Sequence, residues 1–139
     1  PFGKVVSGGE LSRIMLAVKA LLADKDDIET LIFDEIDTGI SGRTAQKVSE
    51  KMEYIGRSRQ VLCITHLPQI AAMADAHYEI KKQVEKGQTV SRIARLDEQA
   101  SIRELARMLG GAEITRRVEE SAREMKELAV VHKTARLKS

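Results

Sequence analysis

Two short apolar runs, separated by one amphipathic segment, constrain the fold of this chain more than any other feature. Residues 30–33 (TLIF) and 61–65 (VLCIT) have the length and apolar character of buried strands. Residues 43–55 between them carry apolar side chains at helical spacing. Alternation of strands and helices is typical of a parallel sheet that is flanked by helices. The sequence therefore predicts an α/β fold built on this strand–helix–strand unit.

The segments around this unit also have clear patterns. A capping box formed by Ser7 and Glu10 starts a helix, alternation around Gly87 indicates a hairpin, and Gly110-Gly111 ends a further helix. We therefore expect a helix at residues 7–22, a short helix at residues 68–73 and a β-hairpin at residues 78–96. Two amphipathic helices should follow at residues 102–109 and 114–129.

The composition excludes several classes of protein. The chain has 139 residues, of which 42% are hydrophobic, and this is too apolar for a disordered tail. No apolar run approaches the roughly 20 residues that span a bilayer, and no signal peptide is visible. A single cysteine, Cys63, excludes an internal disulfide and zinc sites of the Cys/His type. We expect Cys63 to be a small core residue in a protein of the reducing cytoplasm.

Charge is distributed unevenly along the chain. Residues 1–80 carry 9 basic and 12 acidic side chains, whereas residues 81–139 carry 14 and 9, which gives +5 at the C-terminal end. This excess permits a phosphate-bearing partner such as DNA, although charged faces are usually only solvated. Aromatic residues make up 3% of the chain, too few for platforms that stack the bases of single strands.

Two adjacent acids, Asp34 and Glu35, follow the first apolar run directly. Because ligands bind at the carboxyl ends of parallel strands, these acids are candidates for a site at that edge of the sheet. Asp34 suits a magnesium ion held through water, and Glu35 suits the orientation and deprotonation of an attacking water. The alternative is an ordinary strand that is followed by an acidic loop.

The helix that follows Ser7 has glycine at its first two positions, Gly8 and Gly9, before Glu10. Glycine weakens a helix by roughly 1 kcal/mol in its interior, so a cap alone would not require both. Glycines permit close approach of a backbone or ligand, and the free N–H groups of a helix N-terminus favour anions. We interpret this segment as an anion site; the alternative is a capping box with loose glycines.

One histidine, His66, follows the second apolar run in the string Ile64-Thr65-His66. If both runs are parallel strands, His66 lies at the same sheet edge as Asp34 and faces the same ligand. The alternative is a structural histidine with satisfied hydrogen bonds. His77 and His132 have no comparable position, and we interpret them as structural or surface residues.

Three motifs, in this order and spacing, resemble those of the ABC-type and SMC-like ATPases. Residues 6–13 (VSGGELSR) resemble the signature motif, and residues 30–37 (TLIFDEID) resemble the Walker B motif and the start of the D-loop. Thr65-His66 resembles the switch-histidine loop. Longer strings, such as SGGELSRIMLAVKALL, are similar to bacterial DNA repair members of the SMC-like group. The resemblance covers nearly the whole chain.

The resemblance implies a role for each matching residue. Asp34 corresponds to the Walker B aspartate that holds Mg²⁺, Glu35 to the catalytic glutamate, and His66 to the switch histidine that senses the γ-phosphate. Many family members have aspartate where this chain has Ser41, so the cross-dimer role of that aspartate is not carried over. The residues of the signature motif and D-loop that are expected to bind ATP are Ser7, Gly8, Gly9, Glu10 and Asp37.

A phosphate-binding loop of the form G-x-x-x-x-G-K-[ST] does not occur in this sequence. In SMC-like proteins this Walker A loop lies in the N-terminal half of the head, before a long coiled coil. The resemblance therefore implies that residues 1–139 are the C-terminal lobe of a P-loop ATPase head, taken from a longer protein. We expect the chain alone to be inactive, and to expose apolar surface where its missing half belongs.

The implied function is an ATP-binding and ATP-hydrolysing head in DNA double-strand break repair and recombination. Its cofactors would be ATP and Mg²⁺. Its partners would be the Walker A lobe, a second head in a homodimer, and DNA, in the cytoplasm and nucleoid of a bacterium and without a membrane. Two alternatives stay open: a lobe of another SMC-like or ABC-type ATPase, and a non-catalytic scaffold module that binds DNA.

Overall fold

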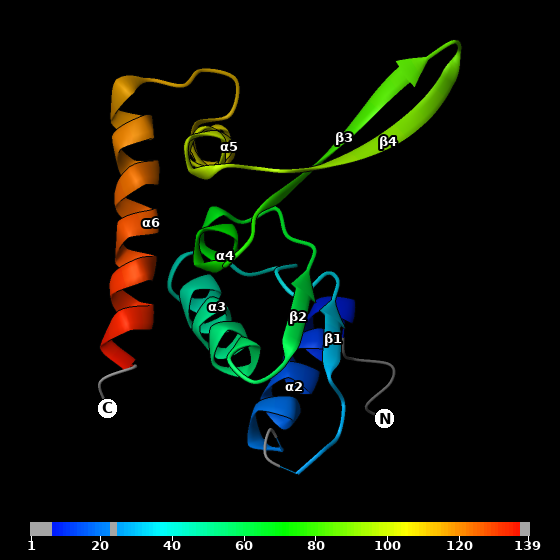
Figure 1. Cartoon of the computed structure of the whole chain (residues 1–139), viewed down its shortest axis with the longest axis vertical. Helices are drawn as coiled ribbons and strands as arrows, with labels where there is room; N and C mark the ends of the chain where they lie inside the picture. The colour runs from blue at the N-terminus through cyan, green and yellow to red at the C-terminus, as the bar shows by residue number, and fades with distance from the viewer. Residues whose placement is uncertain (1–6, 23–24, 137–139) are drawn as a thin grey trace. The chain divides into compact units, whose positions relative to one another are not determined.

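The computed structural model describes residues 7–22 and 25–136 of the chain. The chain divides into two compact units, residues 1–73 and residues 74–139 (Figure 1). Helices, a parallel strand pair and an antiparallel hairpin make the described part a mixed α/β protein. Among the helices described, none has the length and apolar character needed to cross a membrane.

The first unit alternates helices and strands. Its elements, in chain order, are α2 (Gly8–Leu21), β1 (Thr30–Phe33), α3 (Gly42–Gly56), β2 (Gln60–Cys63) and α4 (Pro68–Met73). β1 and β2 pair in parallel, with Thr30 opposite Gln60 and Phe33 opposite Cys63. The predicted strand–helix–strand unit is therefore confirmed, although β2 ends at Cys63 rather than at Thr65.

The predicted capping box is present at the start of α2. Ser7 Oγ accepts a hydrogen bond from Glu10 N at 3.2 Å, and the Glu10 carboxylate accepts one from Ser7 N at 3.1 Å. This reciprocal pair satisfies backbone N–H groups that the first turn of a helix otherwise leaves without a partner.

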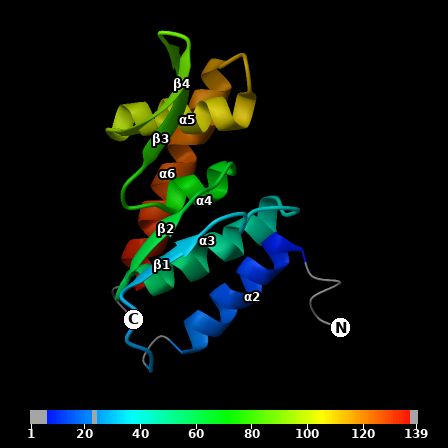
Figure 2. The ribbon, with the colours of Figure 1, turned by 90° about the vertical axis from the view of Figure 1, so that its right-hand side faces the viewer.

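The core of the first unit lies on one face of the strand pair. Leu31 and Phe33 point to this face and pack with Leu16 of α2 and with Val48 and Met52 of α3. Both helices lie on the same side of the two strands (Figure 2). The helical prediction for residues 43–55 is confirmed, since α3 buries its expected apolar positions in this core.

The opposite face of the strand pair is exposed. Ile32 of β1 is 69% exposed, and Leu62 and Ile64 are each about half exposed. We predicted two buried strands, and this is wrong: the residues of β1 alternate between exposed and buried, and those of β2 between exposed and half-buried. The physical reason is that α2 and α3 cover the same face, so the other face of each strand meets solvent.

A second apolar surface lies on α2. The only buried side chain that α2 contributes, within the described residues, is Leu16. The other large apolar side chains of the helix are 40–83% exposed: Leu11, Ile14, Met15, Val18 and Leu21. The expectation that this chain exposes apolar surface is confirmed for both the helix and the sheet face.

The second unit begins with a hairpin. β3 (Tyr78–Glu85) and β4 (Gln88–Arg95) are antiparallel partners in the register Tyr78 to Arg95 and Glu85 to Gln88. Lys86 and Gly87 between them both have positive φ, as a type I′ hairpin turn requires. The predicted hairpin and its turn are confirmed.

Two helices, α5 (Glu98–Gly110) and α6 (Arg116–Arg136), complete the second unit. α5 begins after Asp97, whose carboxylate accepts a hydrogen bond from Ala100 N, and is followed by its C-cap residue Gly111, where φ is 68°. Ile114 was expected within the last helix, but α6 begins at Arg116 and Ile114 is exposed. The buried apolar residues of these helices are Ile102, Leu105, Ala106, Ala122 and Ala129.

Candidate functional site

The loops that follow β1 and β2 meet at one edge of the parallel strand pair. Strand pairing continues past β2, because Ile64 N donates to the Phe33 carbonyl oxygen at 3.0 Å. The chain then leaves each strand at the same end, with Asp34 and Glu35 after β1 and His66 after β2. This arrangement of Asp34, Glu35 and His66 at one sheet edge is the one predicted from the sequence.

Asp37 joins the two loops. Its Oδ2 atom accepts hydrogen bonds from Thr65 Oγ1 at 2.5 Å and from His66 N at 2.8 Å, and it lies 2.9 Å from His66 Nδ1. The Asp37 residue is 3% exposed. Burial alone would raise the pKa of Asp37, but the hydrogen bonds from Thr65 and His66 outweigh burial and hold the pKa below its ordinary value. Asp37 is therefore a charged, buried link between the loops.

The two glycines at the start of α2 lie against the loop that follows β1. A Cβ atom on Gly8 would lie 2.6 Å from Glu35 Oε2, and one on Gly9 would lie 2.9 Å from the Glu35 carbonyl oxygen. Real Cβ contacts are not this short, and because the neighbour of Gly9 is backbone, this position requires glycine. The neighbour of Gly8 is the end of a flexible side chain, which can move. Packing within the chain thus accounts for Gly9.

Two side chains of α2 hold this loop in place. Ser12 Oγ donates to the Asp34 carbonyl oxygen at 3.0 Å. Arg13 Nη1 donates to the carbonyl oxygens of Ile36, at 3.0 Å, and Thr38, at 2.8 Å. Ser12 and Arg13 lie within the string that resembles the signature motif, but no role was predicted for them. Their helical spacing from the two glycines was the signal that could have placed them toward the same loop.

Glu35 has an unusual backbone conformation. Its φ is 58°, in the left-handed region that non-glycine residues rarely adopt, and such conformations cost about 1–3 kcal/mol. Two hydrogen bonds stabilise the turn: Glu35 N donates to Asp34 Oδ1 at 2.8 Å, and Thr38 N donates to the Glu35 carbonyl oxygen at 3.1 Å. The conformation directs the Glu35 side chain toward Gly8 at the N-terminus of α2.

The carboxylates at this edge provide few ligands for a metal ion. Within the residues that the structure describes, no three Asp, Glu, His or Cys side chains are placed to hold a metal together. Asp34 is exposed, and its Oδ1 accepts the hydrogen bond from Glu35 N. A single carboxylate suits Mg²⁺, which keeps several waters and is commonly bound through one or two carboxylates and substrate phosphates.

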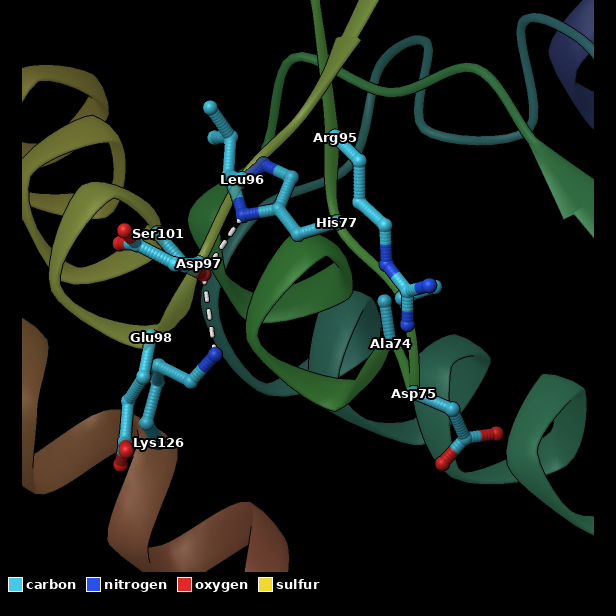
Figure 3. A pocket seen from close by; sticks show the side chains of 10 residues that line it. Ala74, Asp75, His77, Arg95, Leu96, Asp97, Glu98, Ser101 and Lys126 are labelled. Atoms are coloured by element: carbon cyan, nitrogen blue, oxygen red, sulfur yellow. Dashed lines mark hydrogen bonds between the residues drawn. The ribbon is translucent and has the colours of Figure 1, made fainter.

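A separate pocket of about 260 Å³ lies within the second unit and contains none of the predicted site residues. At its wall, Ser101 Oγ lies 2.8 Å from His77 Nδ1 and accepts a hydrogen bond from Lys126 Nζ at 2.9 Å (Figure 3). Burial, and then the charge of Lys126, lower the pKa of His77. His77 is thus a half-buried structural residue, as the sequence analysis interpreted it.

Cys63 lies beside the core of the first unit. It is partly buried and packs against the core residues, which agrees with its expected place in the interior. Burial, together with the charges of Asp37 and Asp34, raises the pKa of its thiol to about 12. The thiolate is the reactive form of cysteine, so Cys63 is unsuited to nucleophilic or redox chemistry.

The chain has clear relatives among known proteins. No family model matches it. It is 48% identical over 122 residues to the DNA repair protein RecN of Bacillus subtilis, and this match covers 88% of the chain and 21% of the relative. It is 46% identical over 125 residues to RecN of Vibrio cholerae, with 90% and 23% covered. Against RecN of Deinococcus radiodurans it is 49% identical over 111 residues, with 80% and 19% covered. The chain thus spans about a fifth of the length of these relatives.

Proposed function

Since this chain is homologous to a segment of the RecN DNA repair proteins, we propose that it forms the C-terminal lobe of an ATP-hydrolysing head that acts in DNA repair. The observation that carries this proposal is the convergence of Asp34, Glu35 and His66 at one sheet edge, where Asp37 links both loops. In this head, Asp34 holds Mg²⁺ and Glu35 acts as the general base.

The chemistry of the site supports these assignments. Mg²⁺, when bound with ATP, neutralises charge on the phosphate oxygens. Glu35 is exposed and acts on a water molecule, whose proton the carboxylate accepts. The backbone of Glu35 is fixed by hydrogen bonds with Asp34 and Thr38, so its side chain leaves the main chain at this edge before substrate arrives. His66, with a ring that is 71% exposed, is available to a phosphate group from the solvent side.

The N-terminus of α2 supplies the second part of the proposed site. Residues Ser7, Gly8, Gly9 and Glu10 form its first turn, and the positive end of the helix dipole lies here. Because the capping box leaves other N–H groups of the first turn available, this face suits the γ-phosphate of ATP bound on a second head. The proposed assembly is therefore a homodimer of heads.

The exposed apolar surface supports the proposal that another segment of the head packs against this chain. The outer face of the strand pair and the apolar stripe of α2 together expose large side chains that a complete domain buries. We assign this surface to the Walker A lobe of the same head, which carries the phosphate-binding loop missing from this sequence. DNA is the proposed substrate of the whole assembly, in double-strand break repair and recombination in the bacterial cytoplasm and nucleoid.

Reconstitution of the head tests this function. The chain is mixed with the N-terminal region of its parent protein that carries the phosphate-binding loop, and ATP binding and phosphate release are measured. Glu35→Gln should lower phosphate release by about 10²–10⁴-fold and leave ATP affinity unchanged, because only the base is lost. Glu113→Gln, an exposed glutamate between α5 and α6, is the matched control. Normal hydrolysis by Glu35→Gln, or failure of the wild-type mixture to bind ATP, would overturn the proposal.

A further inference from the structure

The geometry points to Asp37 as a positioning residue that holds His66 with its hydrogen on Nδ1 and its Nε2 facing solvent. The resemblance places Asp37 among the residues that contact ATP. In the structure, however, the carboxylate is buried, and its Oδ2 atom serves Thr65 and His66. Asp37 therefore acts through another residue. The effect of Asp37 on catalysis rests on the proposed function, whereas its effect on the orientation of His66 does not.

The close contact between the Asp37 carboxylate and the His66 ring sets the tautomer of the ring. An ionised carboxylate only accepts hydrogen bonds, and the carboxylate of Asp37 is kept ionised by its donors. The ring nitrogen that lies 2.9 Å from Oδ2 is Nδ1, and a hydrogen on Nδ1 replaces repulsion between its lone pair and the carboxylate by attraction. A free neutral histidine has no such constraint and can carry its hydrogen on either nitrogen.

Neighbouring groups make this pairing rigid. Thr65 Oγ1 donates to Asp37 Oδ2 and accepts a hydrogen bond from Leu67 N at 3.1 Å. His66 N donates to the same Oδ2 atom, so backbone and ring of His66 are held by one carboxylate. The ring of His66 is 71% exposed whereas the side chain of Asp37 is 3% exposed. The solvent side of the ring therefore presents Nε2.

This orientation has a consequence for the binding of an anion. Phosphate oxygens accept hydrogen bonds, so Nε2 binds one only when it also carries a proton, which solvent supplies. The buried carboxylate of Asp37 lies on the far side of the ring from Nε2 and holds the ring in this orientation, as in other Asp–His pairs. Asp37 thus prepares His66 to donate from Nε2 to a phosphate group.

The tautomer can be measured without any enzymatic activity. Nitrogen-15 NMR of the 139-residue chain at pH 8 reports the protonation of each ring nitrogen, and His66→Gln identifies the His66 signals. We expect a protonated Nδ1 and an unprotonated Nε2 in the wild type. Asp37→Asn should move His66 toward a mixture of both tautomers, while Asp75→Asn, at an exposed aspartate, should not. A wild-type ring with its hydrogen on Nε2, or an unchanged ring in Asp37→Asn, would overturn the inference.

Kinetics of the complete parent protein give the second readout. Asp37→Asn should lower kcat about 10²-fold, because a misplaced catalytic group loses that much, and should leave the KM for ATP within about threefold. Asp75→Asn should change neither constant. Equal kcat values for Asp37→Asn and wild type would overturn the positioning role. If the tautomer behaves as expected but the wild-type parent hydrolyses no ATP, the positioning of His66 stands and the proposed function fails.

Discussion

Arg13 Nη1 donates a hydrogen bond to the Thr38 carbonyl oxygen at 2.8 Å and thereby ties α2 to the loop that follows β1. The same nitrogen also donates to the Ile36 carbonyl oxygen at 3.0 Å. One guanidinium therefore holds both ends of the segment that includes Asp37. A substitution at the N-terminus of α2 is therefore expected to displace Glu35 and Asp37, because the Arg13 hydrogen bonds and the packing of Gly8 and Gly9 connect α2 to this loop.

We expect Arg13→Ala to destabilise the first unit. The substitution leaves the carbonyl oxygens of Ile36 and Thr38 without their charged donor, and losses of this kind cost about 1–3 kcal/mol. Urea unfolding followed by circular dichroism measures the change, with Arg103→Ala, at an exposed position on α5, as the control. A free energy of unfolding equal to that of the control would show that these two hydrogen bonds of Arg13 contribute nothing to stability.

Gly9→Ala should also be destabilising, for a steric reason. The new Cβ atom would lie 2.9 Å from the Glu35 carbonyl oxygen and 2.9 Å from Thr38 Cβ, so the loop must move. Overpacking of this kind costs about 1–3 kcal/mol. Gly56→Ala is the matched control, because its nearest neighbour, Val61 Cγ2, is 4.0 Å away and alanine favours a helix by about 0.5–1 kcal/mol. Equal stability of the two variants would contradict the close approach of α2 to the loop.

These contacts show what the sequence could and could not predict. Strands, helices and caps were predictable because each depends on local spacing, such as the capping box of Ser7 and Glu10. The shared edge of Asp34 and His66 was predictable because parallel neighbours end at the same side. The hydrogen bonds from Arg13 to Thr38 and from His66 to Asp37 were not, because they join residues 25 and 29 positions apart and depend on loop conformation.

The same limit explains one error. The prediction of buried strands was wrong because a short apolar run does not reveal how many of its faces are covered, and Ile32 meets solvent. It also explains contacts that could not be predicted. Asp26 forms ion pairs with Lys19, at 2.9 Å, and with Arg59, which lies 33 positions further along the chain. No local sequence pattern predicts such a pair.

The stability of the second unit should fall in mild acid. Burial, and then the charge of Lys126, lower the pKa of His77 and outweigh the opposite effects of Glu104 and Glu79. Since the unfolded chain then binds the proton more tightly than the folded one, stability is full above a pH of about 6.5 and decreases as the pH falls below it. A protonated His77 can no longer accept from Ser101, whose Oγ already accepts from Lys126.

Urea unfolding of the wild type and of His77→Gln at pH 8 and pH 5.5 measures this dependence. Glutamine stays neutral and can still accept a hydrogen bond, so the variant should lose less stability between the two pH values. An identical pH dependence in both proteins would exclude His77 as its source.

The isolated chain should self-associate through the exposed face of its strand pair. Ile32 and Leu62 are neighbours on that face, and exposed apolar patches beside an open strand edge favour association. Ile32→Thr combined with Leu62→Thr places β-branched residues at both strand positions and removes apolar surface. Sedimentation velocity should show a larger monomer fraction for this variant than for the wild type. A wild-type chain that stays monomeric at high concentration would contradict the prediction.

Substitutions of Ser7 separate the role of α2 in its own head from its proposed role toward a second head. Ser7→Arg adds bulk and removes the helix cap, whereas Ser7→Asp keeps a good cap and places a negative charge where a phosphate group is expected. In the reconstituted head, both variants should bind ATP with wild-type affinity, because α2 acts on the nucleotide of the opposite head. Both should fail to dimerise with ATP in light scattering. Ser7→Asn, a neutral residue that also caps helices, is the control and should dimerise. Loss of ATP binding by single heads of Ser7→Asp would show that α2 contacts the nucleotide of its own head.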